Sequence, residues 1–381
     1  MINDTESADL ANQRFKLEQS VLHVSRPATG GLKQHLDVLI NELARNSVPC
    51  ALAAAPQLTA AISLVHPWLK IWPLPIADRP SPLVDIRSAV ALRAIVEKQR
   101  PAIVHAHGIR AAWIVSLARI SVPIVVSIHN LYWPGRWIGS VLSRRALDSA
   151  SVIIAVSQAA ARTVEMAGIK PPIYVVPNGL VFPRPKPKQS RPEYRMANGI
   201  ALDDTLVSCL ARLMPDKGVD ILLDAWVTVS SRHSNAHLVI GGDGPDRSAL
   251  ESVAANLPNV HIVGYIWDTA SLLEASDIVA IPSRREGQSI VCLEAMATES
   301  QPALVVSRAG GLPEMVEDEV TGLVCSPDDA VALANGIIKL IDSPALRQHV
   351  GDEAYRRVHA RYSATAMAAA IIRVYVEATG D

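Results

Sequence analysis

Residues 21–45 read VLHVSRPATGGLKQHLDVLINELAR, a short apolar run followed, after a glycine pair, by a longer amphipathic run. The first five residues are predicted to form a buried strand. In the second run Leu32, Leu36, Leu39, Ile40 and Leu43 recur at the three- and four-residue spacing of a helix. Such strand–helix pairs repeat along the chain, and their strands are apolar on both faces. This alternation predicts an α/β fold with doubly wound parallel sheets.

The pattern is interrupted once, at FPRPKPKQSRPEYR (182–195), which holds four prolines. Proline removes a backbone donor and disfavours helix interiors, so this stretch is predicted to be a semi-rigid linker. The expected parts are a disordered tip at 1–14, a first domain at 15–181, a linker at 182–199, a second domain at 200–362, and a helix at 363–381 that crosses back to the first domain. Strands are expected at 102–107, 123–129, 151–157, 173–177, 205–210, 237–242, 259–264, 277–283 and 303–307, and helices at 217–231, 246–256, 290–299, 328–341 and 344–361.

Composition excludes several classes of protein. The 381 residues are 49% apolar and carry a net charge of −1, which argues against a disordered chain and gives no basic footprint for nucleic acid. Four scattered cysteines form no CxxC pair, as expected for buried thiols. The acidic start lacks a signal-peptide layout, and prolines break the most apolar region, 50–77. We therefore expect a cytoplasmic protein. The alternative is a cytoplasmic protein bound peripherally to the inner face of a membrane.

The segment SRREGQSIVCLEAMA (283–297) carries two glutamates with seven residues between them. Glu286 lies in a turn after a predicted strand, and Ser289 is a suitable N-cap for a helix that carries Glu294. The free backbone N–H groups at that helix start suit a diphosphate, while the carboxylates suit hydroxyl groups. Together these groups would fit a sugar nucleotide. The alternative is a solvated loop glutamate and an ordinary helical one.

Two cations accompany a second predicted strand end, in LARLMPDKGVDILLDAW (210–226). Arg212 follows the strand and Lys217 precedes a helix. Placed at the carboxyl end of a strand, they could neutralise the diphosphate of a leaving nucleotide. The alternative is ordinary surface charge.

Together these segments resemble the retaining family-4 glycosyltransferases, which have the GT-B fold of two facing Rossmann-like domains with a cleft between them. The family's E-x7-E element matches Glu286 and Glu294, and its R-x4-K element matches Arg212 and Lys217. The resemblance covers residues 20–381, and further motifs follow in the family's order: GGLKQH (30–35), VHAHG (104–108), SIHN (127–130), IIAVSQAA (153–160), IYVVPNGL (173–180), IGGDGP (240–245), VGY (263–265), SDIVAIPS (276–283) and GGLPEMV (310–316).

The resemblance implies a set of roles. Arg212 and Lys217 would hold the diphosphate, Glu286 the hydroxyls of the donor sugar, and His129 would face that sugar. Glu294 would hold the ribose. The remaining implied donor contacts are Gly242, Gly264, Tyr265, Gly287, Gln288, Ser289, Ile290 and Val291, and the implied acceptor or phosphate loop is Gly30 and Gly31. One departure is TESQP (298–302), which lacks the family's glycine, so we expect the helix to end differently there.

No metal cofactor is expected, because no Asp-x-Asp motif falls on this set of residues. His105 and His107 would point to the same side of a strand, as an HxH metal pair does. No third ligand accompanies them nearby in the sequence, so packing or acceptor contact is expected instead. His23, His35 and His261 are interpreted as structural groups with satisfied hydrogen bonds.

Residues 132–148, YWPGRWIGSVLSRRALD, place Tyr132, Trp133 and Trp137 beside Arg136, Arg144 and Arg145. Tryptophan next to arginine suits a membrane interface or a bulky acceptor. The alternative is a lid loop followed by an ordinary amphipathic helix.

The predicted function is transfer of a sugar from a UDP- or GDP-linked donor to a hydroxyl acceptor, a glycan or lipid-linked sugar, in cell-surface polysaccharide or glycolipid biosynthesis. Two alternatives stay open. One is another sugar-nucleotide enzyme of the same fold, such as an epimerase or a phosphorylase. The other is a non-catalytic binding relative.

Overall fold

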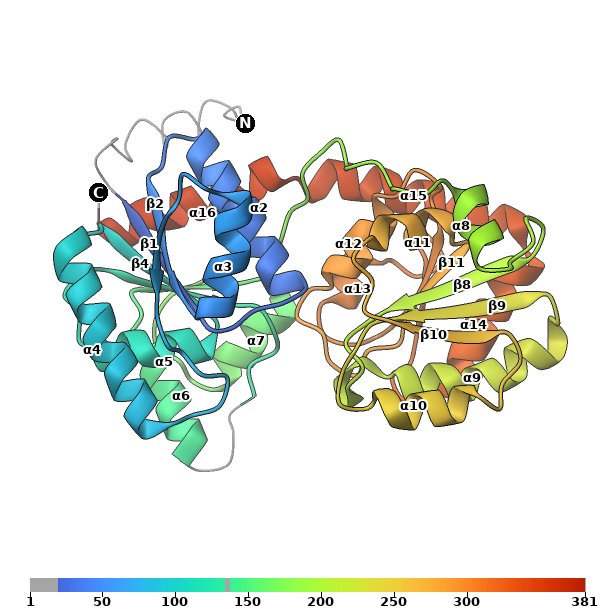
Figure 1. Cartoon of the computed structure of the whole chain (residues 1–381), viewed down its shortest axis with the longest axis horizontal. Helices are drawn as coiled ribbons and strands as arrows, with labels where there is room; N and C mark the ends of the chain where they lie inside the picture. The colour runs from blue at the N-terminus through green and yellow to red at the C-terminus, as the bar shows by residue number, and fades with distance from the viewer. Residues whose placement is uncertain (1–19, 134–137, 381) are drawn as a thin grey trace. The chain divides into compact units, whose positions relative to one another are not determined.

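The computed structural model describes residues 20–133 and 138–380. The chain divides into two compact units, coloured along the chain in Figure 1. Unit 1 comprises Met1–Gly179 together with Ala364–Asp381, and unit 2 comprises Leu180–Ser363. The expected disordered tip at 1–14 lies outside the described residues.

Unit 1 is built on a parallel sheet of seven strands in the order β3-β2-β1-β4-β5-β6-β7. Its strands are β1 (Val21–Ser25), β2 (Cys50–Ala54), β3 (Lys70–Pro73), β4 (Ile103–His107), β5 (Ile124–Ile128), β6 (Val152–Ala155) and β7 (Ile173–Val175). Its helices are α2 (Gly31–Arg45), α3 (Pro56–Val65), α4 (Pro82–Gln99), α5 (Ile109–Ala118), α6 (Ile138–Asp148), α7 (Gln158–Met166) and α16 (Ala364–Thr379).

The central strands of unit 1 are buried on both faces because successive side chains alternate between two cores. Leu22 and Val104 face one core, which includes α4 and α5. Val21 and Ile103 face the other, which includes α2 and α16. This double burial is why the strands read as continuous apolar runs.

Unit 2 repeats the plan with six parallel strands in the order β10-β9-β8-β11-β12-β13. The strands are β8 (Thr205–Leu210), β9 (Ala236–Gly241), β10 (Val260–Gly264), β11 (Ile278–Ile281), β12 (Ala303–Ser307) and β13 (Leu323–Cys325). The helices are α8 (Arg191–Ala197), the 3-10 turn η1 (Pro215–Lys217), α9 (Val219–Arg232), α10 (Arg247–Ala254), α11 (Thr269–Ala275), α12 (Ile290–Met296), α13 (Leu312–Met315), α14 (Ala330–Asp342) and α15 (Pro344–Arg361).

Both sheets confirm the predicted doubly wound α/β class. The segment expected to be a linker is different, since its second half forms α8 within unit 2. Pro192 lies in the first turn of that helix, where a missing N–H costs nothing. Glu193 and Ser190 add a capping box, so the proline count alone was a poor guide.

The final helix, α16, packs in unit 1 against the core that holds β1, β4 and β5 (Figure 1, red). Its Tyr375 is fully buried and its hydroxyl lies 2.7 Å from His105 Nδ1. The chain enters unit 2 at Leu180 and leaves it after Ser363. These two points are close together, because Leu180 N donates to Tyr362 O at 2.8 Å. Within the described residues, every helix is either too short or too polar to cross a membrane.

Candidate functional site

Lys217 and Glu286 form an ion pair at the carboxyl edge of the unit 2 sheet. Lys217 follows β8 and Glu286 follows β11, and these two strands are parallel neighbours. Lys217 Nζ donates to Glu286 Oε2 at 2.6 Å, and Ser283 Oγ donates to the same oxygen at 3.2 Å. The strand order reverses between β8 and β11, which makes this the topological switch point where ligands bind in open α/β sheets.

Two glycines allow the loops around this pair to pack closely. Gly310 has φ +52°, and a Cβ there would lie 1.8 Å from Glu286 O. Gly311 N donates to the same carbonyl at 3.0 Å. Gly218 has φ +65°, and a Cβ there would lie 2.1 Å from Pro282 O. Larger residues would force the backbone apart, so these glycines fix Glu286 and Lys217 where they are.

Arg284 ties the Lys217 turn to its surroundings, and sequence analysis assigned it no role. Its guanidinium donates to both carboxylate oxygens of Asp220, at 2.8 and 2.7 Å, and to Pro215 O at 2.7 Å. It also pairs with Asp328. These acids raise the pKa of Arg284 further above its ordinary value. Because a bidentate arginine–carboxylate pair has a fixed geometry, Arg284 holds η1, the turn that carries Lys217, in place. The sequence signal for this role is that Arg284 lies two residues before Glu286.

Arg212 lies on the same edge, in the loop after β8. Its side chain is exposed, while the backbone around it is held against the loop after β9. Leu213 N donates to Asp243 O at 3.0 Å, and a Cβ on Gly242 would lie 1.8 Å from Ala211 O. Arg212 and Lys217 are therefore presented from one braced segment.

Glu294 lies on α12 and pairs with Arg184, whose Nη2 donates to Oε1 at 2.9 Å. From the sequence, Arg184 is expected only to belong to the linker at 182–199. The α12 N-cap is Ser289, as predicted, with Oγ accepting from Cys292 N at 3.2 Å. The helix ends at Met296 rather than at the expected residue 299. In the turn that follows, Gln301 has φ +52°.

The other predicted donor residues surround the same edge. Gly287, Gln288 and Ser289 are buried, and Ile290 and Val291 are half-buried. Gly264 ends β10 with φ +73°, and its carbonyl accepts from Gly242 N at 2.7 Å. Tyr265 is 53% exposed, and its ring meets the Trp267 ring edge-on at 4.9 Å.

Five histidines cluster in unit 1, which sequence analysis did not foresee. His105 and His107 share one face of β4, as predicted, and β1 places His23 in register beside His105. His35 comes from α2, and its ring meets that of His129 edge-on at 4.7 Å. No third ligand accompanies the HxH pair nearby in the sequence, but in the fold β1 and β5 lie on either side of β4 and bring His23 and His129 close to the pair. His261 lies apart, exposed on β10.

Burial keeps these imidazoles neutral. It lowers the pKa of His23 to about 3 and that of His35 to about 4, and the Asn178 side chain, as an acceptor for the His35 ring, opposes the second shift. Burial also lowers the pKa of His105, His107 and His129 well below the ordinary value, and the neighbouring histidines add to this. Arg26 adds a further positive charge near His129.

Unit 1 is expected to lose stability as the pH falls from 6.5 toward 4. Unfolded histidines have a pKa near 6.5, so below that pH the unfolded chain takes up protons that the folded cluster does not. Each histidine then lowers the free energy of unfolding by up to about 1.4 kcal/mol per pH unit. Hydrogen exchange of peptides that span β4, measured in EDTA at pH 7, 6 and 5, should show this loss. The exposed His261→Gln variant should keep the full effect, and protection of β4 that is constant across this range would contradict the prediction.

The two remaining predicted segments of unit 1 lie at the starts of helices α2 and α6. Gly30 is the N-cap of α2 with φ +58°, and both it and Gly31 are exposed. In 132–148, Tyr132 is buried with its hydroxyl 2.9 Å from Ser143 Oγ, whereas Trp133 is 71% exposed. The predicted contacts Arg136 and Trp137 lie outside the described residues.

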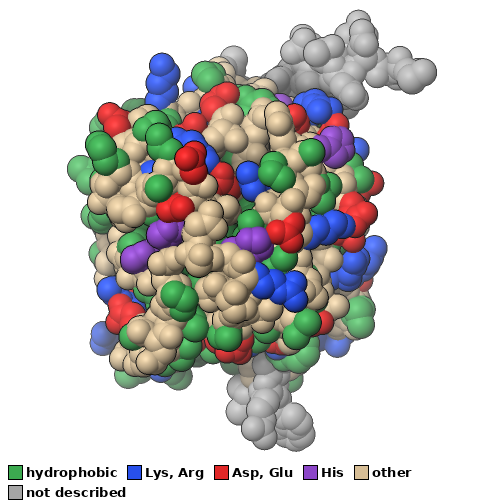
Figure 2. Space-filling view, turned by 90° about the vertical axis from the view of Figure 1, so that its right-hand side faces the viewer, with side chains coloured by type: hydrophobic (Ala, Val, Ile, Leu, Met, Phe, Trp, Pro, Cys, Tyr) green, Lys and Arg blue, Asp and Glu red, His purple; other side chains and the backbone are tan. Residues whose placement is uncertain are grey.

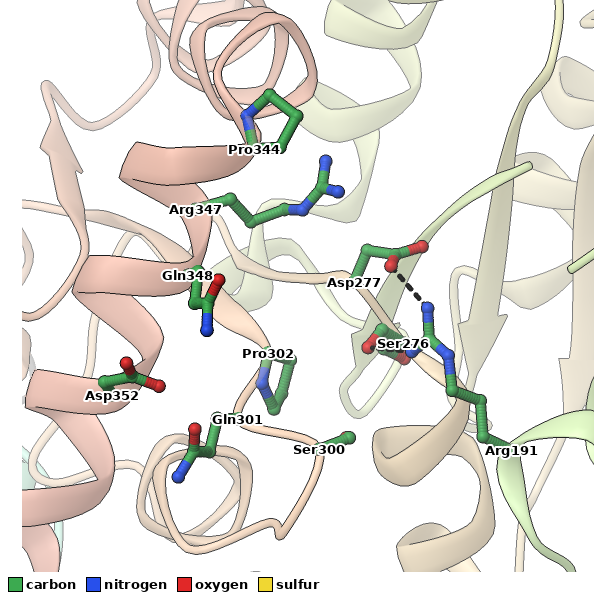
Figure 3. Close-up of a pocket in the computed structure, with 10 residues that line it drawn as sticks. All are labelled: Arg191, Ser276, Asp277, Ser300, Gln301, Pro302, Pro344, Arg347, Gln348 and Asp352. Atoms are coloured by element: carbon green, nitrogen blue, oxygen red, sulfur yellow. Dashed lines mark hydrogen bonds and ion pairs between the residues drawn. The ribbon is translucent and has the colours of Figure 1, made fainter. Parts of the chain in front are cut away.

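A pocket of about 350 Å³ lies elsewhere in unit 2, as Figure 3 shows. Asp277 and Pro302 line it, and they immediately precede β11 and β12. It is therefore at the amino edge of the sheet, opposite the Lys217–Glu286 pair. In it Arg191 is committed to Asp277, with Nη2 2.5 Å from Oδ1.

Charge is not concentrated on the face of the molecule that Figure 2 views. Figure 2 shows acidic and basic side chains intermixed on the face it views, in keeping with a net charge of −1. A phosphate ligand would thus depend on a few placed cations.

Two family models match the chain. Residues 29–181 match Glycosyltransferase Family 4, and residues 190–357 match Glycosyl transferases group 1. An uncharacterized glycosyltransferase from Methanocaldococcus jannaschii is 33% identical over 187 residues, which are 48% of this chain and 47% of the relative. A GDP-mannose-dependent monoacylated alpha-(1-6)-phosphatidylinositol monomannoside mannosyltransferase from Corynebacterium glutamicum is 31% identical over 239 residues, 59% of this chain and 62% of the relative. The chain thus spans about half the length of the first of these relatives.

Among solved structures, HepE from Anabaena in complex with UDP-glucose superposes with a TM-score of 0.81 at 22% identity, covering 92% of this chain and 98% of that one. Two Rossmann-like units of this kind define the GT-B class of glycosyltransferases. Because both halves match a family model, the chain belongs to glycosyltransferase family 4, the glycosyl transferases of group 1.

Proposed function

We propose that this protein transfers a sugar, with retention of configuration, from a UDP- or GDP-linked donor to a hydroxyl on a glycan or lipid-linked acceptor, in polysaccharide or glycolipid biosynthesis. The observation that carries the proposal is the Lys217–Glu286 pair at the switch point of unit 2. A fixed cation and a fixed carboxylate side by side suit a ligand that has a diphosphate next to sugar hydroxyls. The relatives described above support the same substrate class.

In the proposed reaction the bond between the sugar C1 and the diphosphate oxygen breaks, and the acceptor oxygen bonds to C1 from the same face. The acceptor's proton passes to the leaving phosphate. Arg212 and Lys217 neutralise the charge that develops on that phosphate, so we expect no metal cofactor there. Glu286 accepts hydrogen bonds from donor-sugar hydroxyls, and Glu294 does so from the ribose. Gly264 and Tyr265 lie near the base.

Unit 1 supplies the acceptor side of the proposal. His129 faces the donor sugar, and Gly30 and Gly31 contact phosphate or acceptor. The exposed Trp133 supports acceptor contact by residues 132–148, including a lipid-linked acceptor at the inner face of a membrane. The protein would work in the cytoplasm.

A donor panel tests the proposal. UDP- and GDP-sugars are incubated with the protein, with and without acceptors, while nucleoside diphosphate release and thermal shift are followed. At a ligand concentration 100 times Kd, binding stabilises the fold by about 2.7 kcal/mol. We expect one donor to shift the melting curve and to release its diphosphate when an acceptor is present. Epimerised donor without release would favour the epimerase alternative, and neither shift nor release would favour the non-catalytic relative.

A further inference from the structure

The histidine cluster of unit 1 contains two sets of three residues. In each set, three ring nitrogens lie close enough together to bind one metal ion. One is His23, His105 and His107, and the other is His35, His107 and His129; in each the nitrogens lie within 4.8 Å of one another. His107 is the last residue of β4 and His129 follows β5, while His23 and His105 are the middle residues of β1 and β4. The strand order of unit 1 reverses between β1 and β4.

The first set is a hydrogen-bonded chain. Both ring nitrogens of His105 are engaged, Nδ1 with Tyr375 at 2.7 Å and Nε2 with Ser127 Oγ at 2.7 Å. His23 Nδ1 lies 3.0 Å from His107 Nε2, a normal hydrogen-bond length. A metal would have to break these bonds.

The second set has different spacing. His107 Nδ1 and His129 Nε2 are 3.4 Å apart, long for a hydrogen bond between nitrogens. Two imidazole nitrogens on one tetrahedral zinc, with bonds of about 2.0–2.1 Å, are separated by about 3.3–3.4 Å. His35 completes the set from α2 and is buried, as is His107.

The other ring nitrogen of His107, Nε2, has a fixed hydrogen-bond partner, as is usual for a metal-binding histidine. His107 Nε2 is bonded to His23 Nδ1, which leaves Nδ1 as the nitrogen that points to the shared space. A fixed outer partner of this kind sets the tautomer and orientation of a metal-binding histidine. His23 is itself buried, and within the described part of the chain its Nε2 has no hydrogen-bond partner.

We propose that His35, His107 and His129 bind one Zn²⁺ ion. Three imidazole nitrogens with a fourth position left for water or a ligand are an established zinc arrangement. The site belongs to unit 1 and shares His129 with the sugar-transfer proposal, but its readout is metal binding, so the failure of either proposal can be recognised separately. His23 is a positioning residue.

The test uses the full chain without a purification tag, stripped with EDTA. Co²⁺ is titrated as a probe, its visible absorption band reports tetrahedral coordination, and Zn²⁺ is added in competition. We expect one Co²⁺ per chain, displaced by Zn²⁺. His35→Ala and His129→Ala should each weaken binding by more than the ~10–100-fold that loss of an outer partner costs, and His23→Ala should fall within that range.

Matched controls separate the set from its neighbours. His105→Ala and the exposed His261→Ala should bind Co²⁺ as the unaltered protein does, and circular dichroism shows which variants are folded. Absence of bound Co²⁺ and Zn²⁺ in the unaltered protein would overturn the proposal. So would unchanged binding in folded His35→Ala and His129→Ala, or a loss in folded His105→Ala as large as in His35→Ala, which would place the metal on the first set.

Discussion

Replacing Lys217 with alanine is expected to lower kcat for sugar transfer by about 10²–10³, the cost of removing one placed group that stabilises developing charge. Lys217 Nζ is fixed 2.6 Å from Glu286 by the η1 turn and Gly218. It is thus ready to neutralise the leaving diphosphate without reorganising. Steady-state release of nucleoside diphosphate, with acceptor present, measures the change.

The same variant leaves the carboxylate of Glu286 buried without its cation, so its melting curve has to be compared with that of the unaltered protein. Lys339→Ala is the matched control, because Lys339 pairs with Glu319 in the same unit and both side chains are largely exposed. It should transfer sugar at the normal rate. A folded Lys217→Ala variant with more than a third of normal kcat would contradict the assigned role.

Removal of residues 364–381 is expected to unfold unit 1, although the deleted stretch is at the opposite end of the sequence from its first strand. Five large side chains of α16 are buried there: Met367, Ile371, Ile372, Val374 and Tyr375. At about 2 kcal/mol each, their burial contributes on the order of 10 kcal/mol, comparable to the whole stability of a typical domain.

Hydrogen exchange resolves this outcome by unit. Peptides from β4 and β5 should lose protection, while those from β8 and β11 keep theirs. Truncation after Thr379, which leaves α16 intact, is the control and should change neither unit. Normal protection of β4 in the shorter chain would show that α16 is dispensable for unit 1.

Much of the fold was predictable because hydrophobic pattern and connection length are local properties. The predicted bounds of 21–25, 205–210, 303–307 and 344–361 match β1, β8, β12 and α15. The strands that sequence analysis did not assign are short or ambiguous. In β2 the residues CALAA lack β-branched side chains, and β3 is an edge strand that ends on Pro73. Such segments become strands only because a neighbour supplies the hydrogen-bonding partners.

The candidate site was predictable where its residues follow strand ends. The alternation and the family motifs predicted that Lys217 and Glu286 each follow the end of a strand, and the structure brings them into contact. Contacts between remote segments were not predictable. Arg184 reaches Glu294 across 110 positions, and His23 meets His107 across 84. Strand order brings His23 to His107, and no local pattern encodes strand order.

The return of α16 to unit 1 has a consequence for synthesis on the ribosome. Unit 2 is continuous from Leu180 to Ser363, so all of it has emerged before unit 1 receives its last helix. Until then, the first part of unit 1, which ends at Gly179, lacks the packing of α16 against Val21, Ile103 and Val125. Nascent chains stalled before residue 364 should therefore engage chaperones through unit 1, the half that was translated first.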